Sequence, residues 1–175
     1  MASGRKTGDA TVVDKADGSG SYVVVFLDRS DNHYPVAQVR HILIKAVADS
    51  DGSYTDKAKE IAKNRAEEIL AEFNAGDKTE DSFAELAKDY SEDTGSAENG
   101  GLYDTVYKGA TVEEFDKFCF EGHKKGDTAI VYGESSSYAG YHVMYYVGEG
   151  DLYSNLLAKN DLVNTTVSQW LEDQV

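Results

Sequence analysis

The sequence predicts an α+β fold with one compact domain and flanking structure. The chain has 175 residues, of which 41% are apolar and 11% aromatic, which is enough for one hydrophobic core and too few residues for three domains. Runs with strand character lie near the start of the chain and again at residues 128–147. Segments whose apolar residues recur at three- and four-residue steps lie between and after these runs.

The first strands are predicted to be a hairpin and a central strand. Two short β runs, Ala10 to Val13 and Tyr22 to Leu27, flank a stretch rich in Gly, Ser and Asp that is typical of a turn. A linker from Arg29 to Pro35 holds the only proline. Residues 36–45 are dense in Val, Ile and Leu, which predicts a central strand with His41 inside it.

Two helices are predicted next. The longer helix starts near Lys57 and ends at a C-cap, Gly76. Its apolar residues recur at helical spacing: Ala58, Ile61, Ala62, Ala66, Ile69, Leu70 and Phe73. The shorter helix is predicted to open with a capping box formed by Ser82 and Glu85 and to end near Ser91.

A long loop and a third helix follow. Residues 92–109 carry four glycines and no periodicity, so we expect a loop, and long loops inside compact domains are usually functional. Thr111 and Glu114 repeat the capping-box pattern, which predicts a helix that runs to Gly122.

The chain is predicted to end in two strands and a helix. The strands, Thr128 to Tyr132 and Tyr141 to Val147, are joined by a turn rich in Gly and Ser. After Asp151 a helix is indicated by the apolar residues Leu156, Leu157, Val163, Val167, Trp170 and Leu171. We expect this helix to pack back on the domain or to continue into another region.

The charge of the chain argues against nucleic acid and anionic membranes as partners. There are 32 acidic and 17 basic residues, and binding to a phosphate backbone needs clustered Lys and Arg. More than half of the net charge of −15 lies in residues 77–122, which hold 13 acidic and 4 basic side chains. The longest apolar runs are far below the roughly 18 residues that would cross a bilayer, so a soluble chain is expected.

The first residues and the single cysteine limit other interpretations. Met1 to Gly4 has no apolar signal core, which leaves a cytoplasmic protein or a mature or trimmed fragment as alternatives. Cys119 is the only cysteine, so neither an internal disulfide nor a thiol metal cluster is expected. It lies between two phenylalanines on an apolar helix face, where a thiol is normally an inert small hydrophobe.

A strand-turn-strand pattern occurs twice in the sequence. Residues 8–13 align with residues 126–131, and residues 20–26 align with residues 140–146. Tyr22 then takes the place of His142. Either the N-terminal hairpin is the remnant of a preceding, degenerate unit of the same kind, or two acidic hairpins resemble each other by chance.

Two of the four histidines stand out. His33 and His123 lie in polar stretches and are expected at the surface, whereas His41 and His142 each interrupt an apolar strand. Adjacent strands lie about 4.8 Å apart, so two such imidazoles can meet. Standard phosphate-loop, zinc-protease and nucleophile-elbow motifs are missing from the sequence, and a metal site is not expected.

Five motifs follow one another along the chain. They are Val39-Arg40-His41-Ile42-Leu43-Ile44-Lys45, Phe83-Ala84-Glu85-Leu86-Ala87, Tyr90 to Ala97 with Gly100-Gly101, Glu114-Phe115, and Gly140-Tyr141-His142-Val143. In order and spacing they resemble the parvulin-type peptidyl-prolyl cis/trans isomerases. The resemblance implies a four-stranded, mostly antiparallel sheet with helices packed on it, over residues 36–150. Residues 1–35 are then an N-terminal hairpin with its linker, and residues 151–175 a C-terminal helical extension.

The same resemblance implies the site residues. His41 and His142 match the paired histidines of the family, and Asp93 matches a position that holds a cysteine or an aspartate. Phe115 matches the aromatic floor of the proline pocket. The expected substrate-binding residues are completed by Tyr103, Thr111, Ser137 and Ala139. Thr111 replaces a usual methionine, and Ala139 replaces an aromatic or small polar residue, which predicts a shallower or wetter pocket.

The function that the resemblance implies is isomerisation of X–Pro bonds in unfolded or extended protein segments, without a covalent step, cofactor or metal. Basic flanks are the expected preference because of the acidic segment. Selection for phosphorylated Ser/Thr–Pro is not expected, since residues 46–53 hold neither Arg nor Lys.

The sequence is compatible with two compartments and with two rival functions. Gly100-Gly101-Leu102-Tyr103 and the tyrosine-rich last strand resemble surface-exposed or secreted parvulins of Gram-positive bacteria, which implies an extracytoplasmic protein; a cytoplasmic protein is the alternative. The rival functions are a non-catalytic, peptide-binding chaperone module that uses the same groove, and a structural surface protein that uses the fold for assembly.

Overall fold

The computed structural model describes residues 4–28, 30 and 32–172, and it divides the chain into two compact units. We call Met1–His33 the hairpin unit and Tyr34–Val175 the sheet unit. The boundary lies two residues before the one expected from the sequence. The expectations for Met1 to Ser3, for Arg29 and for the side chain of Leu171 lie outside the described residues.

The sheet unit is built on four strands in the order β4-β3-β6-β5, with every neighbouring pair antiparallel. The expected α+β fold with a four-stranded sheet is confirmed. The strands are β3 (Pro35–Lys45), β4 (Leu102–Val106), β5 (Thr128–Glu134) and β6 (Ala139–Leu152). The sequence predicted a loop where β4 lies. This was wrong because β4 is an edge strand with one fully buried side chain, Val106, and therefore shows no apolar alternation.

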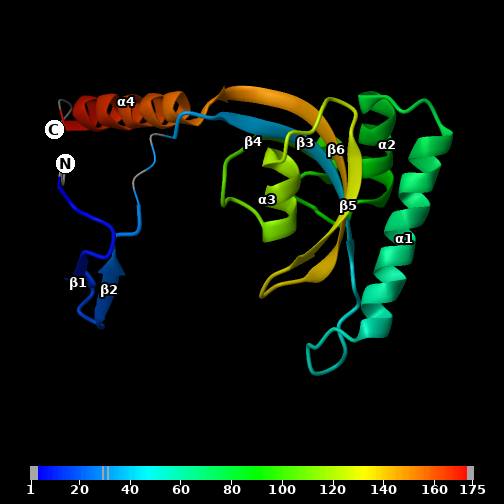
Figure 1. Ribbon diagram of the computed structural model, residues 1–175, viewed down its shortest axis with the longest axis horizontal. Coiled ribbons are helices and arrows are strands. Elements are labelled where there is room, and N and C mark those ends of the chain that lie inside the picture. The colour runs from blue at the N-terminus through cyan, green and yellow to red at the C-terminus, as the bar shows by residue number, and fades with distance from the viewer. Residues whose placement is uncertain (1–3, 29, 31, 173–175) are drawn as a thin grey trace. The chain divides into compact units, whose positions relative to one another are not determined.

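Helices α1 (Asp56–Ala75) and α2 (Glu80–Tyr90) cover one face of the sheet (Figure 1). The predicted long helix is confirmed, with Thr55 as its N-cap and Gly76 as its C-cap. The predicted start of the second helix is wrong. Thr79 is the N-cap, and its side chain and that of Ser82 form the capping box with each other's backbone N–H groups.

Helix α3 (Glu113–Phe120) lies on the opposite face (Figure 1). Its N-cap is Val112, not the predicted Thr111, and no side chain caps the helix. The two faces hold separate cores because side chains alternate along the central strands. The core under α1 and α2 includes Ile42, Phe83, Val143 and Tyr145, and the core under α3 includes Val39, Phe118, Met144 and Tyr146.

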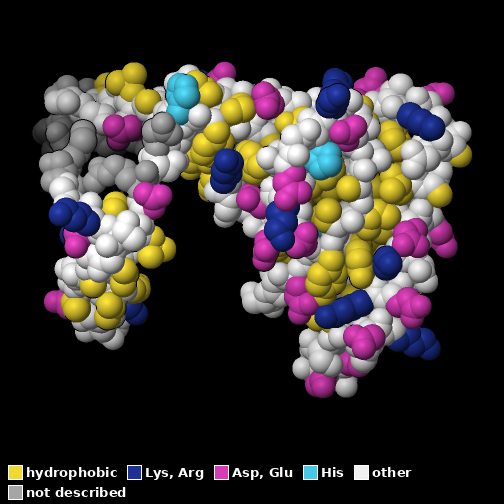
Figure 2. All heavy atoms as spheres, viewed as in Figure 1, with side chains coloured by type: hydrophobic (Ala, Val, Ile, Leu, Met, Phe, Trp, Pro, Cys, Tyr) yellow, Lys and Arg dark blue, Asp and Glu magenta, His cyan; other side chains and the backbone are white. Residues whose placement is uncertain are grey.

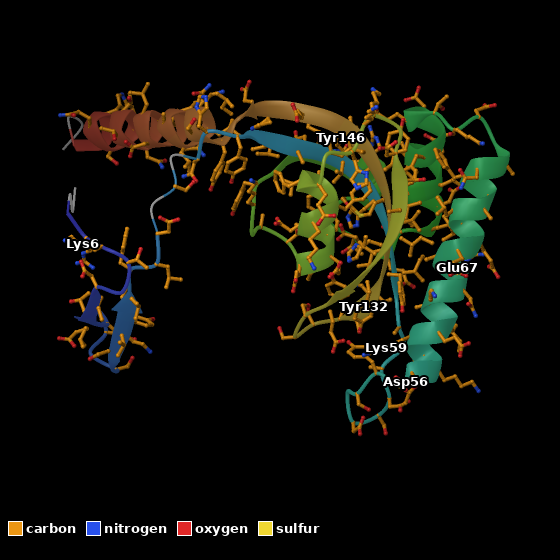
Figure 3. All side chains as sticks on the ribbon, viewed as in Figure 1. Lys6, Asp56, Lys59, Glu67, Tyr132 and Tyr146 are labelled. Atoms are coloured by element: carbon orange, nitrogen blue, oxygen red, sulfur yellow. The ribbon has the colours of Figure 1, made fainter. Side chains whose placement is uncertain are left out.

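One polar cluster ties α1 to the edge of the sheet. Lys59 Nζ donates to Glu134 Oε2 at 3.1 Å and lies 5.4 Å from the centre of the Tyr132 ring. Figure 3 labels Lys59 on the helix and Tyr132 on β5. The contact holds the N-terminal part of α1 against β5, on the face away from α3.

The C-terminal helix α4 (Tyr153–Glu172) continues directly from β6. Its first turn packs through Tyr153, whose ring stacks on Tyr107 at 4.7 Å between centroids. Residues 161–170 are all exposed, including the apolar Leu162, Val167 and Trp170. Beyond its first turns α4 therefore does not pack back on the sheet. Among the described residues, no helix is long and apolar enough to span a membrane.

Candidate active site

The pleat of the sheet places both strand histidines on the α3 face. His41 lies opposite Met144 on β6, and His142 lies opposite Leu43 on β3, so the two imidazoles are diagonal neighbours across this strand pair. The two Nδ1 atoms are 3.0 Å apart, and both residues are buried. The meeting of the two imidazoles expected from the sequence is confirmed.

Asp93 lies in the loop after α2 and accepts a dense set of hydrogen bonds. His41 Nε2 is 3.0 Å from Asp93 Oδ2, and the same oxygen accepts from Ser96 Oγ at 2.6 Å and from Tyr103 Oη at 3.1 Å. The other carboxylate oxygen, Oδ1, accepts from the backbone N–H of Gly95 at 3.2 Å. Oδ1 is thus the less occupied oxygen, on a side chain that stays 20% exposed.

The electrostatics of this cluster have separate physical causes. The hydrogen bond from His41 holds the pKa of the Asp93 carboxyl well below its usual value, although partial burial opposes this. Burial lowers the pKa of His142 to about 3, and the neighbouring His41 adds to the effect. Burial, helped by the charge of Asp93, raises the pKa of Tyr103 to about 12. At neutral pH the cluster therefore contains a carboxylate, a neutral His142 and a protonated Tyr103.

A pocket of about 370 Å³ opens beside the histidine pair. Its lining residues are His41, Tyr103, Ala110, Thr111, Val112, Phe115, Tyr138 and His142. Phe115 is buried, and its ring stands edge-on to His41 at 5.4 Å and to His142 at 5.3 Å between centroids. Asp93 is one hydrogen bond behind this wall, connected to it through His41 and Tyr103.

The structure brings most of the predicted site residues together. Phe115, Tyr103 and Thr111 line the pocket with the two histidines. Thr111 Oγ1 is buried without a hydrogen-bond partner, the only such side-chain atom among the described residues. Ser137 and Ala139 do not line the pocket, since Ser137 is exposed in the turn and Ala139 is fully buried.

Tyr138, between those two residues, reaches the site and was missed from the sequence. Its hydroxyl is 2.9 Å from His142 Nε2. Because a hydroxyl can donate or accept, it can satisfy either tautomer of that imidazole. Gly133 on β5 makes room for this contact, since a Cβ there would lie 2.7 Å from His142 Nε2. No spacing rule marks such a contact, but a tyrosine beside the Gly140-Tyr141-His142 motif is a visible clue.

Two consecutive glycines let the loop after α2 approach the strand of His41. Gly100 and Gly101 have φ of +66° and +70°. A Cβ on Gly101 would lie 2.1 Å from the backbone oxygen of His41, while its own carbonyl accepts from the His41 N–H at 2.9 Å. These positions need glycine for the backbone conformation and also for the contact. The loop thereby places Ser96 and Asp93 against His41.

The remaining candidate groups lie outside this cluster. Cys119 is buried, and burial raises the pKa of its thiol to about 12, so it stays protonated. His33 is exposed as expected, whereas His123 is half-buried and stacks on Phe118 at 4.2 Å between centroids. Within the described residues, no group of three or more His, Cys, Asp or Glu side chains is arranged to hold a metal ion.

An antiparallel four-stranded sheet that brings paired histidines, an acidic residue and an aromatic pocket together defines a parvulin-type domain. The family model described as a PPIC-type PPIASE domain matches residues 22–147. The chain therefore belongs to the PPIC-type (parvulin) peptidyl-prolyl isomerase family.

The chain is also similar to particular proteins. The chain is 30% identical over 146 residues to foldase protein PrsA 3 of Bacillus anthracis, covering 83% of this chain and 43% of the foldase. It is 36% identical over 103 residues to chaperone SurA of Alcanivorax borkumensis, covering 57% of this chain and 21% of that protein. A solved structure of the peptidylprolyl isomerase PrsA from Bacillus anthracis has a TM-score of 0.49 and 29% identity, covering 74% of this chain and 51% of that chain. The chain thus spans less than half the length of foldase protein PrsA 3.

Proposed function

We propose that this protein catalyses cis/trans isomerisation of X–Pro bonds in unfolded or extended protein segments. One observation carries the proposal: Tyr138, His142 and His41 form a hydrogen-bonded wall of an aromatic pocket floored by Phe115, and Asp93 holds this wall from behind through His41. Aromatic-lined grooves are the usual binding surfaces for proline. A segment presented there places its prolyl bond beside the histidine pair.

The reaction requires no covalent chemistry. Rotation about the C–N bond loses amide resonance over a barrier of about 18–20 kcal/mol, and each 1.4 kcal/mol removed is worth about tenfold in rate. The protein needs only to bind the twisted amide better than the planar one. Phe115 and the two imidazoles exclude water from the proline ring, which strengthens every electrostatic effect at the bond.

Asp93 is the proposed source of that electrostatic effect. A carboxylate near the prolyl carbonyl disfavours the partial negative charge on its oxygen, and this weakens the C–N double-bond character. Three donors fix Oδ2 and leave Oδ1, which accepts one backbone N–H, as the oxygen best placed to act. His41 and His142 position the carboxylate and shape the pocket, and no proton transfer to the substrate is needed.

Two substitutions of Asp93 test this role. With a proline tetrapeptide as substrate, we expect Asp93→Ala to lower kcat/KM at least tenfold, which corresponds to about 1.4 kcal/mol in the barrier. Asp93→Asn keeps the size and an acceptor oxygen but removes the charge. If Asn restores full turnover, the charge is not required. Unchanged turnover in Asp93→Ala would refute the role of Asp93 altogether.

A non-catalytic, peptide-binding chaperone is the second candidate. The similarity to a protein named as a chaperone favours it, and so does the buried, unpaired hydroxyl of Thr111 in the pocket, which weakens an apolar grip on proline. An NMR exchange measurement on an Ala–Pro peptide separates the two functions. A binder shifts the peptide resonances without accelerating cis/trans exchange, whereas an isomerase accelerates it.

The charge of the chain bears on substrate choice. Residues 77–122, which include Asp93 and helix α3, hold 13 acidic and 4 basic side chains. We propose a preference for prolines flanked by Lys or Arg, which weakens as salt screens the field. Turnover of Lys–Pro, Ala–Pro and Glu–Pro peptides at low and high salt tests this, and equal turnover of the three at low salt would contradict it.

We also propose that the protein acts outside the cytoplasm. The support is its similarity to foldases of Bacillus and Staphylococcus. Protease treatment of intact cells, with a cytoplasmic enzyme as the protected control, tests the location. Digestion of this protein alone is the expected result, and equal protection of both proteins would contradict it.

A further inference from the structure

The two strands of the hairpin unit pair in the same register as the last two strands of the sheet unit. β1 (Ala10–Asp14) pairs with β2 (Ser21–Val25), and β5 pairs with β6. Four successive rungs correspond: Ala10↔Val25 to Thr128↔Tyr145, Thr11↔Val24 to Ala129↔Met144, Val12↔Val23 to Ile130↔Val143, and Val13↔Tyr22 to Val131↔His142. The alignment of the two sequence segments is therefore also an alignment of their hydrogen-bonded partners.

The turns that precede the two hairpins have the same sequence pattern and the same backbone hydrogen bonds. Each turn has the sequence Gly-x-Lys-x-Gly-Asp, beginning at Gly4 and at Gly122. The equivalent bonds are Gly8 N to Phe26 O (2.8 Å) and Gly126 N to Tyr146 O (2.9 Å), Phe26 N to Asp9 O (2.8 Å) and Tyr146 N to Asp127 O (2.9 Å), and Asp9 N to Lys6 O and Asp127 N to Lys124 O (both 2.9 Å). Figure 3 labels Lys6 in this turn.

A side-chain contact separates this likeness from a chance resemblance. The carboxylate Asp9 Oδ2 accepts from Lys6 N at 2.7 Å, as Asp127 Oδ2 accepts from Lys124 N at 2.8 Å. Any antiparallel hairpin repeats ladder bonds, but this bond depends on one residue type at one position of the entering turn. The copies differ at the tip, where the β5–β6 ladder continues for two more rungs.

The environments of the two hairpins differ sharply. In the sheet unit, β6 pairs with β5 along one edge and with β3 along the other, and residues 142–145 are at most 4% exposed. In the hairpin unit, the equivalent residues Tyr22 to Val25 are between 42% and 74% exposed, and no described strand pairs with the other edge of β2. Figure 2 shows hydrophobic side chains gathered on the surface of this unit. An isolated two-stranded hairpin is marginal in water, so this surface needs a partner.

We infer that residues 4–27 are the closing hairpin of a second isomerase-like fold, whose central strand, equivalent to β3, pairs with the free edge of β2. The partner is a polypeptide segment with the pattern of residues 35–121, which supplies that strand and helices for both faces. Tyr22 stands where the sheet unit has His142, so the second fold has no histidine pair at this position. The inference depends on the fold and not on catalysis.

A graft within the full chain tests the equivalence. Residues 122–147 are replaced by a copy of residues 4–27, so that β3 of the same chain meets the copied β2. The copy carries Val25→Tyr, which restores the large ring of Tyr145 and avoids a cavity. A control graft also deletes Val24, which slips the register and turns the following side chain to the wrong face. Amide hydrogen exchange at the copied Val23 is the readout.

We expect Val23 to be protected in the graft and unprotected in the control. The readout is amide exchange and not turnover, so the result of the graft is independent of the proposed function. If the graft does not fold, a second experiment is made on the intact chain, which is titrated with a peptide of residues 35–45. Amide shifts confined to β2 and its turn support the inference. An unprotected graft together with unshifted β2 amides overturns it.

Discussion

At the scale of single residues, Tyr138 lines the pocket and is hydrogen-bonded to a buried imidazole. Its hydroxyl is the partner of His142 Nε2, and without it that nitrogen is buried and unpaired. We expect Tyr138→Phe to lower kcat/KM about five- to tenfold, the equivalent of about 1–1.4 kcal/mol for a lost hydrogen bond.

The matched control for this change is Tyr141→Phe. Tyr141 packs against Tyr132 on the other face of the sheet, 5.2 Å between ring centroids, and is not part of the pocket lining. It should leave turnover unchanged in the same peptide assay. Equal losses in both variants would show that Tyr138 acts through general stability and not by holding His142.

The residue-level prediction of the site was uneven for a physical reason. His41 stands out from sequence because a polar residue in an apolar strand is unusual, and Asp93 was placed by its loop motif. Ser96, Gly133 and Tyr138 carry no such local mark. Their roles depend on which atom they face across a loop or a neighbouring strand, and composition does not encode this.

At the scale of elements, the approach of the Gly100-Gly101 loop to β3 should be the least tolerant feature. We expect Gly101→Ala to destabilise the fold by more than about 3 kcal/mol, because its Cβ would collide with the His41 carbonyl in addition to the strain of a positive φ. Gly109→Ala is the control. It has φ of +80° but nothing within 4 Å of the added Cβ, so it should cost about 1 kcal/mol.

Urea unfolding of the two glycine variants measures the difference directly. Similar midpoints for Gly101→Ala and Gly109→Ala would mean that the backbone conformation alone sets the cost. A lower midpoint for Gly101→Ala, with turnover lost in the fraction that stays folded, would show that the contact also positions Asp93 and Ser96 against His41.

Elements with a periodic, buried face were predicted well, and those without one were not. Helix α1 buries Ala62, Ala66, Ile69 and Phe73 at helical steps, so its pattern was visible in the sequence. Strand β4 and the start of α3 were missed or misplaced. Strand β4 is defined by its pairing with β3, and α3 starts at Glu113 after an N-cap, Val112, that has no capping side chain.

At the scale of the whole molecule, the buried histidine predicts acid sensitivity. The pKa of His142 is about 3 in the folded protein and near 6.5 when unfolded, so between these values only the unfolded chain takes up the proton. The contribution of the neutral His142 to the free energy of unfolding is therefore complete above about pH 6.5. It falls as the pH is lowered, with a slope of up to about 1.4 kcal/mol per pH unit. The lowered pKa of Asp93 adds a further loss below its ordinary value of 3.8.

Urea midpoints at pH 7.5, 5.5 and 4.5 test this pH dependence. In wild-type protein the midpoint should fall steadily, whereas His142→Gln, which cannot take up a proton, should give a flatter profile over the same range. A parallel fall in both proteins would assign the acid sensitivity to other groups.

The sequence by itself determined the α+β class, the central strand, the first two helices and, through local motifs, the residues of the histidine pair and Asp93. Periodicity reports which face of an element is buried, and a motif reports residues close together in the chain. Only the tertiary structure decided that the Nδ1 atoms of His41 and His142, 101 residues apart, lie 3.0 Å from each other, that β4 forms one edge of the sheet, and that Tyr138 completes the network. These features depend on strand register and loop closure, which are set by the packing of the whole sheet.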